Sequence, residues 1–203
     1  LLDSYEQERR PIAEINTQQS LHNAARLIPL FAKATTALES GEVSLSTVQQ
    51  IRDEIEANRD HFTSAGLQLG FSYGPPVHGP ADSTRYDPSI EQGARLPHAW
   101  LEKGGRRLSI LDMLDLGKFT LLAGPAGQAW RAWADASSDL RLVLLDDSIR
   151  FESDWPGMST IAGTGAILAR PDGHIAAVVR DDSTASQQSL SRTLRGYLID
   201  LER

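Results

Sequence analysis

The stretch Phe119-Thr120-Leu121-Leu122-Ala123-Gly124-Pro125 decides the fold of this 203-residue chain. Its first five residues form a short, mainly apolar run suited to a buried strand, and Gly124-Pro125 then ends the strand with a proline preset for a first helical turn. We therefore expect a strand over 119–123, a helix over 126–137 and a second buried strand over 140–145. A strand, helix, strand order implies a parallel pair joined by a right-handed crossover.

The residues that follow complete this sheet. Two strands are expected over Ala166–Ala169 and Ile175–Val179, because Pro171-Asp172-Gly173 between them is a hairpin signal. A last helix is expected from about Ala185 to Leu201. The order β-α-β-β-β-α is the layout of the thioredoxin fold. Disulfide exchange is excluded, because the chain has no cysteine and the place of the dithiol holds Gly124-Pro125-Ala126-Gly127.

The upstream residues predict helices. Apolar residues recur at mostly helical spacing from Leu1 to about Lys33, which indicates one long helix or two in sequence. Pro11 lacks an amide hydrogen, so we expect a kink or a restart near Arg10. A second helix is expected to be capped by Ser46, with Gln49 three residues on, and to bury the stripe Val48, Ile51, Ile55 and Phe62.

A change of composition separates the two halves. The stretch from Gly70 to Gly93 carries Gly74-Pro75-Pro76, Gly79-Pro80 and Asp87-Pro88, which stop helices and remove backbone donors. We interpret it as an irregular linker. The prediction is an α/β chain with an N-terminal helical segment over 1–69, a Pro/Gly-rich linker over 70–94 and a thioredoxin-like domain without a redox dithiol over 95–203.

The overall composition bounds the class of protein. Hydrophobic residues make up 40% of the chain and charged residues 23%, which is typical of an ordinary globular protein. The formal net charge of -7 argues against a nucleic-acid or anionic-membrane surface. No apolar run approaches the roughly 18 residues of a membrane helix. The absence of cysteine fits a cytoplasmic protein, which is the location we expect. The first residue is Leu1 and not Met, which favours a chain that begins inside a larger protein.

Two glycine-containing turns could in principle hold a phosphate. The turn Gly124 to Gly127 opens a helix, so its free amides could receive an anion, but a tight connection is the more common role of such turns. Gly163-Thr164-Gly165 superficially resembles part of a dinucleotide fingerprint, yet it precedes a strand and Leu168 stands where the third glycine belongs. We reject the second reading and expect a structural role for the first.

No other local pattern predicts a catalytic or metal site. The histidines His22, His61, His78, His98 and His174 are scattered, and we expect hydrogen-bonded or solvated side chains. Asp146-Asp147 lacks a third oxygen ligand nearby, and Trp130 and Trp133, three apart on one helix face, indicate core or interface packing. Ser109, Ser153 and Ser159 lack the glycine pattern of a hydrolase nucleophile.

Four segments nevertheless resemble a known family in the right order. They are Leu1 to Pro11 (LLDSYEQERRP), Gly93 to Leu101 (GARLPHAWL), Leu108 to Asp112 with Lys118 to Leu122, and Gly165 to His174 (GAILARPDGH). Together they cover nearly the whole chain. The sequence resembles flavoprotein aromatic hydroxylases of the phenol and 2,4-dichlorophenol 6-monooxygenase type, with polyketide hydroxylases as related proteins.

The resemblance implies an FAD- and NAD(P)H-dependent enzyme that inserts one oxygen atom into a phenolic ring. The family's dinucleotide fingerprint, its second pyrophosphate motif and its Gly-Asp-Ala motif lie upstream of what corresponds to Leu1, so we carry no catalytic, cofactor-binding or metal-binding residue onto this chain. We expect the chain alone to be inactive and to bind no cofactor. Leu2, Tyr5 and Ile12 would then form an exposed face that docks on the missing FAD and substrate domain and favours homo-oligomers.

Three readings of the chain stay open. The first is a non-catalytic C-terminal portion of a flavin monooxygenase, whose partner is the missing part of the same protein. The second is a free-standing interaction or dimerisation protein with a degenerate thioredoxin-like fold. The third is a separate subunit that completes a flavin subunit in trans. The aromatic substrate is not predicted, because the residues that would surround it are upstream in the family.

Overall fold

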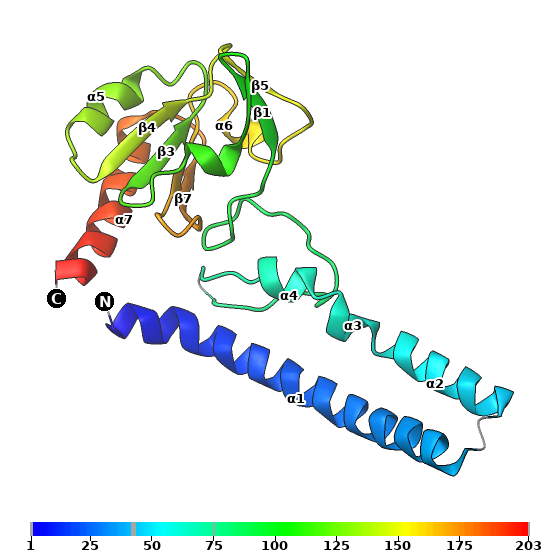
Figure 1. Ribbon diagram of the computed structural model, residues 1–203. Helices are drawn as coiled ribbons and strands as arrows, with labels where there is room; N and C mark the ends of the chain where they lie inside the picture. The colour runs from blue at the N-terminus through cyan, green and yellow to red at the C-terminus, as the bar shows by residue number, and fades with distance from the viewer. Residues whose placement is uncertain (1, 42–43, 75, 203) are drawn as a thin grey trace. The chain divides into compact units, whose positions relative to one another are not determined.

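A computed structural model of the chain describes residues 2–41, 44–74 and 76–202 (Figure 1). The predicted α/β class with an N-terminal helical segment is confirmed. The chain separates into two compact units, of which the first comprises Gln7–Phe71 and Gly79–Asp87 and the second comprises Pro88–Arg203 with the short segments Leu1–Glu6 and Ser72–His78. Among the described residues, no helix is long and apolar enough to cross a membrane.

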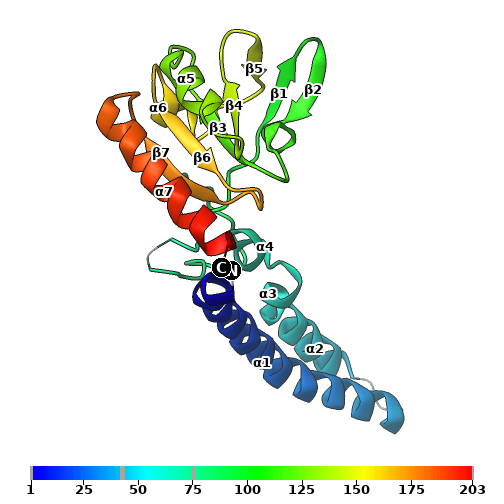
Figure 2. The ribbon, with the colours of Figure 1, turned by 90° about the vertical axis from the view of Figure 1, so that its left-hand side faces the viewer.

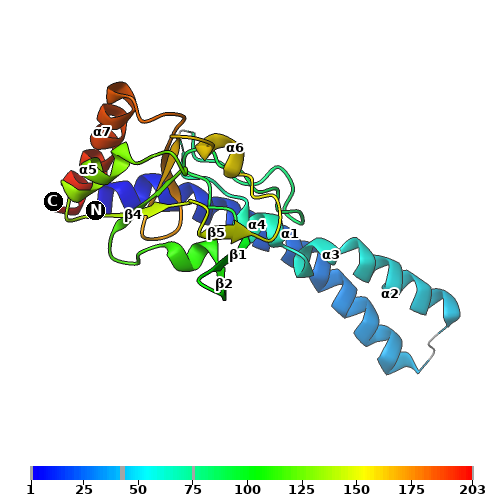
Figure 3. The same ribbon diagram turned by 90° about the horizontal axis from the view of Figure 1, so that it is seen from above.

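The first unit is helical. It contains most of α1 (Leu2–Ser40), together with α2 (Leu45–Ala57), α3 (Arg59–Phe62) and α4 (Ala65–Leu69). Figures 1 and 3 show α1 and α2 side by side and antiparallel, and the ammonium group of Lys33 lies 2.7 Å from Oε1 of Glu54 between them. Of the two N-terminal alternatives, one long helix is correct: α1 runs through both Pro11 and Pro29 without a restart.

Two predictions about α2 are wrong. Its N-cap is Ser44, whose hydroxyl accepts from the Thr47 amide at 3.1 Å, and not Ser46, which lies inside the first turn. The apolar stripe predicted to be buried is also largely exposed, because no residue of α2 is buried and the exposed fractions of Ile55 and Phe62 are 51% and 71%. Spacing identified the apolar face correctly, but spacing does not say whether another element covers it.

The segment 79–87 belongs to the same unit as α4. The Leu67 amide donates to the Ser83 carbonyl at 2.9 Å. A Cβ atom on Gly66 would lie 1.9 Å from the Asp82 carbonyl oxygen, so only glycine allows this close approach.

The second unit is built on a four-stranded sheet. Its strands are β3 (Phe119–Ala123), β4 (Leu140–Leu144), β6 (Ala166–Ala169) and β7 (Ile175–Val179), in the order β4-β3-β6-β7. The predicted parallel pairing of β3 with β4 and the predicted hairpin of β6 with β7 are both confirmed, and β3 pairs with β6 antiparallel. The thioredoxin-like classification stays a prediction.

A second, three-stranded sheet was not predicted. It has the order β2-β1-β5, with β1 (Trp100–Lys103), β2 (Arg106–Ser109) and β5 (Ile149–Phe151), and both of its pairs are antiparallel. The short helices η1 (Ile110–Met113) and α6 (Met158–Ile161) were missed as well. The hairpin between β1 and β2 turns at Gly104 and Gly105, whose φ values of 58° and 73° favour glycine at both positions.

Two hydrophobic clusters lie on the two faces of the four-stranded sheet. One contains Leu121, Leu168 and Ala176 and joins the sheet to α5 (Ala129–Asp135) and α7 (Thr184–Glu202) through Trp130 and Leu190. The other contains Leu122, Val143, Ile167 and Ile175 of the strands and joins the sheet to β1, η1 and α6. Figure 2 shows α7 alongside β7. The predicted helix over 126–137 is shorter than expected, because residues 126–128 form a turn.

The Pro/Gly-rich stretch contains no helix or named strand between residues 71 and 94, apart from residue 75, which lies outside the described residues. Parts of it are nevertheless packed in the second unit. Ser72 forms isolated bridges with His78 and Ala94, and the Tyr73 amide donates to the Gly93 carbonyl at 3.0 Å. At the start of β7, the Ile175 carbonyl accepts from the Gly93 amide at 2.7 Å, and the Ile175 amide donates to the Ala94 carbonyl at 2.8 Å.

Candidate functional site

The turn Gly124 to Gly127 has no free row of amides for an anion. The amides of Gly124, Ala126 and Gly127 donate to the carbonyls of Gly165, Gly163 and Gly124 at 2.9–3.0 Å. A Cβ atom on Gly124 would lie 1.8 Å from the Ile161 carbonyl oxygen. These contacts explain the turn as a structural connection, since its donors are already satisfied within the fold.

The residues 163–165 are the partner of this turn. They follow α6 and lead into β6. The Gly163 and Gly165 carbonyls accept from the first turn, and the Thr164 carbonyl accepts from Nε1 of Trp130 at 2.8 Å. This loop therefore contacts the Gly124 turn and α5. It precedes a strand, whereas a dinucleotide fingerprint follows one.

Four of the five histidines are exposed. The ring of His22 lies near Arg26, His61 stacks edge-on with Phe62, Nδ1 of His78 lies 2.9 Å from the Pro76 carbonyl, and His98 stacks edge-on with Trp100. No group of three or more histidine, aspartate or glutamate side chains among the described residues could hold a metal ion.

His174 is the exception, because its exposed fraction is only 3%. Its Nδ1 lies 3.0 Å from the Gly93 carbonyl oxygen, and its ring centroid lies 4.3 Å from that of Tyr73. Arg170 pairs with Asp172 at 2.9 Å, and its guanidinium carbon lies 5.5 Å from the Tyr73 ring centroid. We interpret this cluster as a packed contact of Tyr73 and Gly93 with the β6–β7 hairpin.

The other singled-out side chains have structural contacts. Trp130 is fully buried and Trp133 is half-buried, their ring centroids lie 5.7 Å apart, and Nε1 of Trp133 donates to the Ser191 hydroxyl at 3.0 Å. Their predicted packing role is confirmed. Ser109 caps η1 by accepting from the Leu111 amide at 3.1 Å, whereas Ser153 and Ser159 are exposed.

An exposed apolar face is the first candidate functional surface. On α1 it consists of Leu21, Ile28, Phe31 and Leu38, whose exposed fractions lie between 65% and 75%. Successive members are seven, three and seven residues apart, so they lie within one arc of the helix. We call these four residues the α1 stripe. Val48 and Ile55, also seven apart, continue the exposed apolar character on α2.

Ile12 does not belong to such a surface. Its exposed fraction is 6%, so the prediction that it lies on an exposed docking face is wrong. The side chains of Leu2 and Tyr5, which were predicted to share that face, lie outside the described part of the structure.

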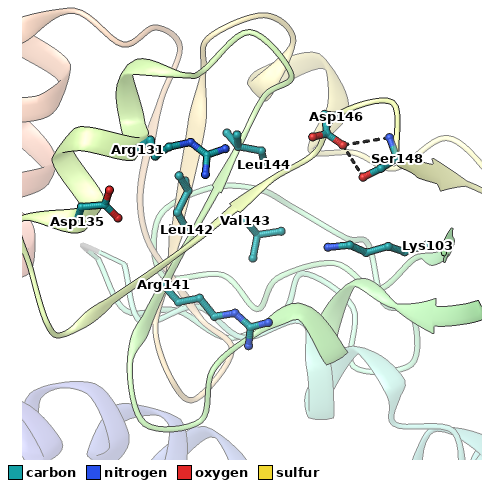
Figure 4. A pocket seen from close by; sticks show the side chains of 9 residues that line it. All are labelled: Lys103, Arg131, Asp135, Arg141, Leu142, Val143, Leu144, Asp146 and Ser148. Carbon is teal, nitrogen blue, oxygen red and sulfur yellow. Dashed lines mark hydrogen bonds between the residues drawn. The ribbon is translucent and has the colours of Figure 1, made fainter.

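A cavity in the second unit is the other candidate. It has a volume of about 390 Å³ and is lined by Lys103 of β1, Arg131 and Asp135 of α5, Arg141, Leu142, Val143 and Leu144 of β4, and Asp146 and Ser148 after β4 (Figure 4). Sequence reasoning singled out only Asp146 among the charged residues here. The others are far apart in the chain, and no local motif connects them.

Asp146 is held by the loop that carries it. Its Oδ1 accepts from the Ser148 hydroxyl at 2.5 Å and from the Ser148 amide at 3.0 Å. These hydrogen bonds, the hydroxyl's foremost, hold the pKa of Asp146 below its usual range, and the positive charge of Lys103 acts in the same direction.

The comparison with protein families agrees with the fold. The family model for the aromatic-ring hydroxylase C-terminal region matches residues 90–198, which is more than half of the chain. The chain belongs to this family. The match covers both sheets and most of α7.

Similar proteins extend the match to the helical residues. The chain is 30% identical to tetracenomycin A2 monooxygenase-dioxygenase of Streptomyces glaucescens over 87% of this chain and 29% of that protein. It is 26% identical to 2,4-dichlorophenol 6-monooxygenase of Delftia acidovorans over 86% of this chain and 36% of the relative. Among solved structures, the flavin-dependent monooxygenase PieE in complex with FAD and substrate is 26% identical, with a TM-score of 0.71, and 96% of this chain aligns with 40% of PieE.

These relatives confirm the resemblance drawn from the sequence motifs. The chain spans about a third of the length of the curated relatives it matches. The aromatic-ring hydroxylases it resembles are therefore much longer proteins, of which this chain corresponds to one part.

Proposed function

We propose that the chain is the C-terminal structural portion of an FAD- and NAD(P)H-dependent monooxygenase that hydroxylates phenolic rings, and that it supplies no catalytic group itself. Membership of the aromatic-ring hydroxylase family supports the parent activity. The relatives named for dichlorophenol and phenol support a phenolic substrate. In the described residues, the amides of the Gly124 turn are already used by the fold, which favours a structural role.

The observation that carries the proposal is the α1 stripe. Four large apolar side chains remain at least 65% exposed on one face of α1. Burying apolar surface contributes about 25 cal/mol per Å², so an exposed apolar face of this kind is a favourable contact surface. The relatives are about three times as long as this chain, so a parent protein of that length would contain further domains that the stripe could contact. In the proposal, the helical segment 1–69 packs on the flavin domain through this face.

The first test is flavin retention by the 203-residue chain. The chain is purified, incubated with excess FAD and passed over a desalting column, and the absorbance of bound flavin is measured. We expect no retained yellow flavin. A matched preparation of a longer protein that includes the flavin domain serves as the positive control. Stoichiometric retention by the 203-residue chain would contradict the structural role.

A second candidate function rests on the same surface. A free-standing dimerisation protein could cover the α1 stripe with a second copy of itself. A subunit that acts in trans could instead cover the stripe with a separate flavin subunit. Native mass spectrometry of the protein from its source separates these cases. A single polypeptide about three times the length of this chain supports the leading proposal, whereas a homodimer of the 203-residue chain supports the second candidate.

A further inference from the structure

Three cationic side chains line the cavity beside β4. Lys103 comes from β1, Arg131 from α5 and Arg141 from β4. In Figure 4 their charged ends are spread around Val143, which lies at the centre of the view. The three residues are 28 and 10 positions apart along the chain, so only the fold assembles them.

These cations differ from other cations of the same unit. Arg107 pairs with Glu152, Arg150 with Glu102 and Arg170 with Asp172, each at 2.9 Å or less. Among the described residues, no ion pair within 4.0 Å and no side-chain hydrogen bond involves Lys103, Arg131 or Arg141. A chain with a net charge of -7 has many carboxylates with which it could neutralise them.

Two carboxylates do line the cavity. Asp146 accepts two hydrogen bonds from Ser148, which occupy its Oδ1. Asp135 follows Arg131 by four residues on α5, yet the two form no ion pair in the described structure. With both carboxylates ionised, the five charged side chains sum to a charge of +1, so the cavity still favours an anion.

The backbone of β4 adds hydrogen-bond donors. β4 is an edge strand whose described partner is β3 alone, and the Leu145 amide points toward β3, where it donates to the Ala123 carbonyl at 2.8 Å. Since successive residues of a strand direct their backbone groups to opposite edges, the amides of Leu144 and Leu142 face the unpaired edge beside their own carbonyls. Both residues line the cavity.

We propose that this cavity binds the phosphate group of a small molecule. A planar carboxylate is saturated by one bidentate guanidinium, whereas a tetrahedral phosphate presents three oxygens in different directions. Arg131, Arg141 and Lys103 belong to three different elements, so their donors can reach a tetrahedral group from different directions. The volume of about 390 Å³ also lies within the range of small-molecule sites.

The phosphate could be free or part of a nucleotide, and the test separates these sources. The thermal midpoint of the 203-residue chain is followed while inorganic phosphate, adenosine monophosphate or citrate is added at constant ionic strength. For the two phosphates, the ³¹P NMR signal is followed as well. We expect both phosphates to raise the midpoint above sodium chloride controls, and citrate to act more weakly. Stronger binding of the nucleotide assigns the site to a phosphate ester, and equal binding assigns it to free phosphate.

Matched variants locate the effect. Arg141→Gln and Lys103→Gln should each weaken phosphate binding about tenfold, which corresponds to roughly 1.4 kcal/mol. Arg150→Gln removes the same charge from β5 outside the cavity and should leave binding within twofold of the wild type. Because all three side chains are exposed, each variant should fold, and circular dichroism verifies this. The proposal is overturned if phosphate acts no differently from chloride, or if Arg150→Gln weakens binding as much as Arg141→Gln.

Discussion

Nε1 of Trp130 donates a hydrogen bond to the Thr164 carbonyl oxygen at 2.8 Å and thereby joins α5 to the loop that leads into β6. The same loop accepts the amides of Gly124 and Ala126 through the carbonyls of Gly165 and Gly163. Two hydrogen bonds therefore join two glycine turns that lie about forty residues apart in the chain, and the Trp130 bond adds α5 to this contact. The amides of Gly124, Ala126 and Gly127 in the first turn and the three carbonyls of residues 163–165 are thus occupied within the fold.

Trp130→Phe should destabilise the chain. Phenylalanine keeps an apolar ring in the fully buried site but leaves the Thr164 carbonyl without its indole donor, which costs on the order of 1–3 kcal/mol. Urea unfolding followed by far-UV circular dichroism measures the change. Trp133→Phe is the control, because Trp133 is only half-buried and its partner is the adaptable Ser191 hydroxyl. Equal losses for the two variants would argue against a special role for the Trp130 bond.

Gly124→Ala should be more damaging. The added methyl group would lie 1.8 Å from the Ile161 carbonyl oxygen and 2.4 Å from that of Gly163, and backbone atoms cannot yield as a side chain can. We expect a loss of about 3 kcal/mol or more in the free energy of unfolding. Gly196→Ala is the matched control in α7, where nothing lies within 4 Å of the new methyl group. It should stabilise the helix by about 0.5–1 kcal/mol, and a loss there would contradict the reasoning.

The four-stranded sheet could be predicted because its two central strands, β3 and β6, are buried on both faces. All five residues of β3 and all four of β6 are buried, so each strand is a nearly continuous apolar run of strand length. Their pairing followed from the order of elements and from the short turn between β6 and β7. A small number of strongly apolar segments thus carried most of the correct fold prediction.

The three-stranded sheet was missed because its strands are mostly exposed. One residue of β1 is fully buried, Leu101, and its neighbours Glu102 and Lys103 are charged. The signal that could have found the hairpin is Gly104-Gly105, a pair that supplies positive φ at both turn positions. The cavity was missed for another reason, because Lys103 lies on β1 and lines one cavity with Arg131 and Arg141 only through the tertiary fold.

The error on α2 has a different cause. The seven-residue spacing of Val48 and Ile55 was read correctly as one helix face, but its burial was assumed. Periodicity reports which residues share a face and not what covers that face. In the described residues nothing covers Ile55 or Phe62 fully, so the pattern marks an exposed apolar face and not a core.

Ser148→Ala should raise the pKa of Asp146. Removing the hydroxyl eliminates the foremost of the hydrogen bonds that stabilise the carboxylate, while the amide bond and Lys103 remain. A pKa held below its unfolded value contributes stability that is present above the unfolded pKa and is lost as the pH falls through the folded one. The variant should therefore lose this contribution at neutral pH and show a weaker acid dependence. Carbon NMR of the Asp146 carboxyl measures the titration, and an unchanged midpoint would contradict the assigned cause.

Substitutions in the α1 stripe should change association and not folding. Ile28→Gln combined with Phe31→Gln replaces two side chains that are 67% and 65% exposed, and glutamine is a good helix former. We expect the unfolding free energy to stay within about 0.5 kcal/mol of the wild type, as is usual for surface positions. Sedimentation velocity at several concentrations should show less self-association than the wild-type 203-residue chain, because the exposed apolar face is smaller.

Leu30→Ala is the opposite control on the same helix. Leu30 is only 5% exposed, so its truncation should cost about 2–5 kcal/mol of stability. If the α1 stripe serves as a contact surface, substitution of Ile28 and Phe31 should change self-association, and substitution of Leu30 should change the free energy of unfolding. If the double glutamine variant loses as much unfolding free energy as Leu30→Ala, the α1 stripe is part of the folded core of the chain and not a surface for contact with another domain or protein.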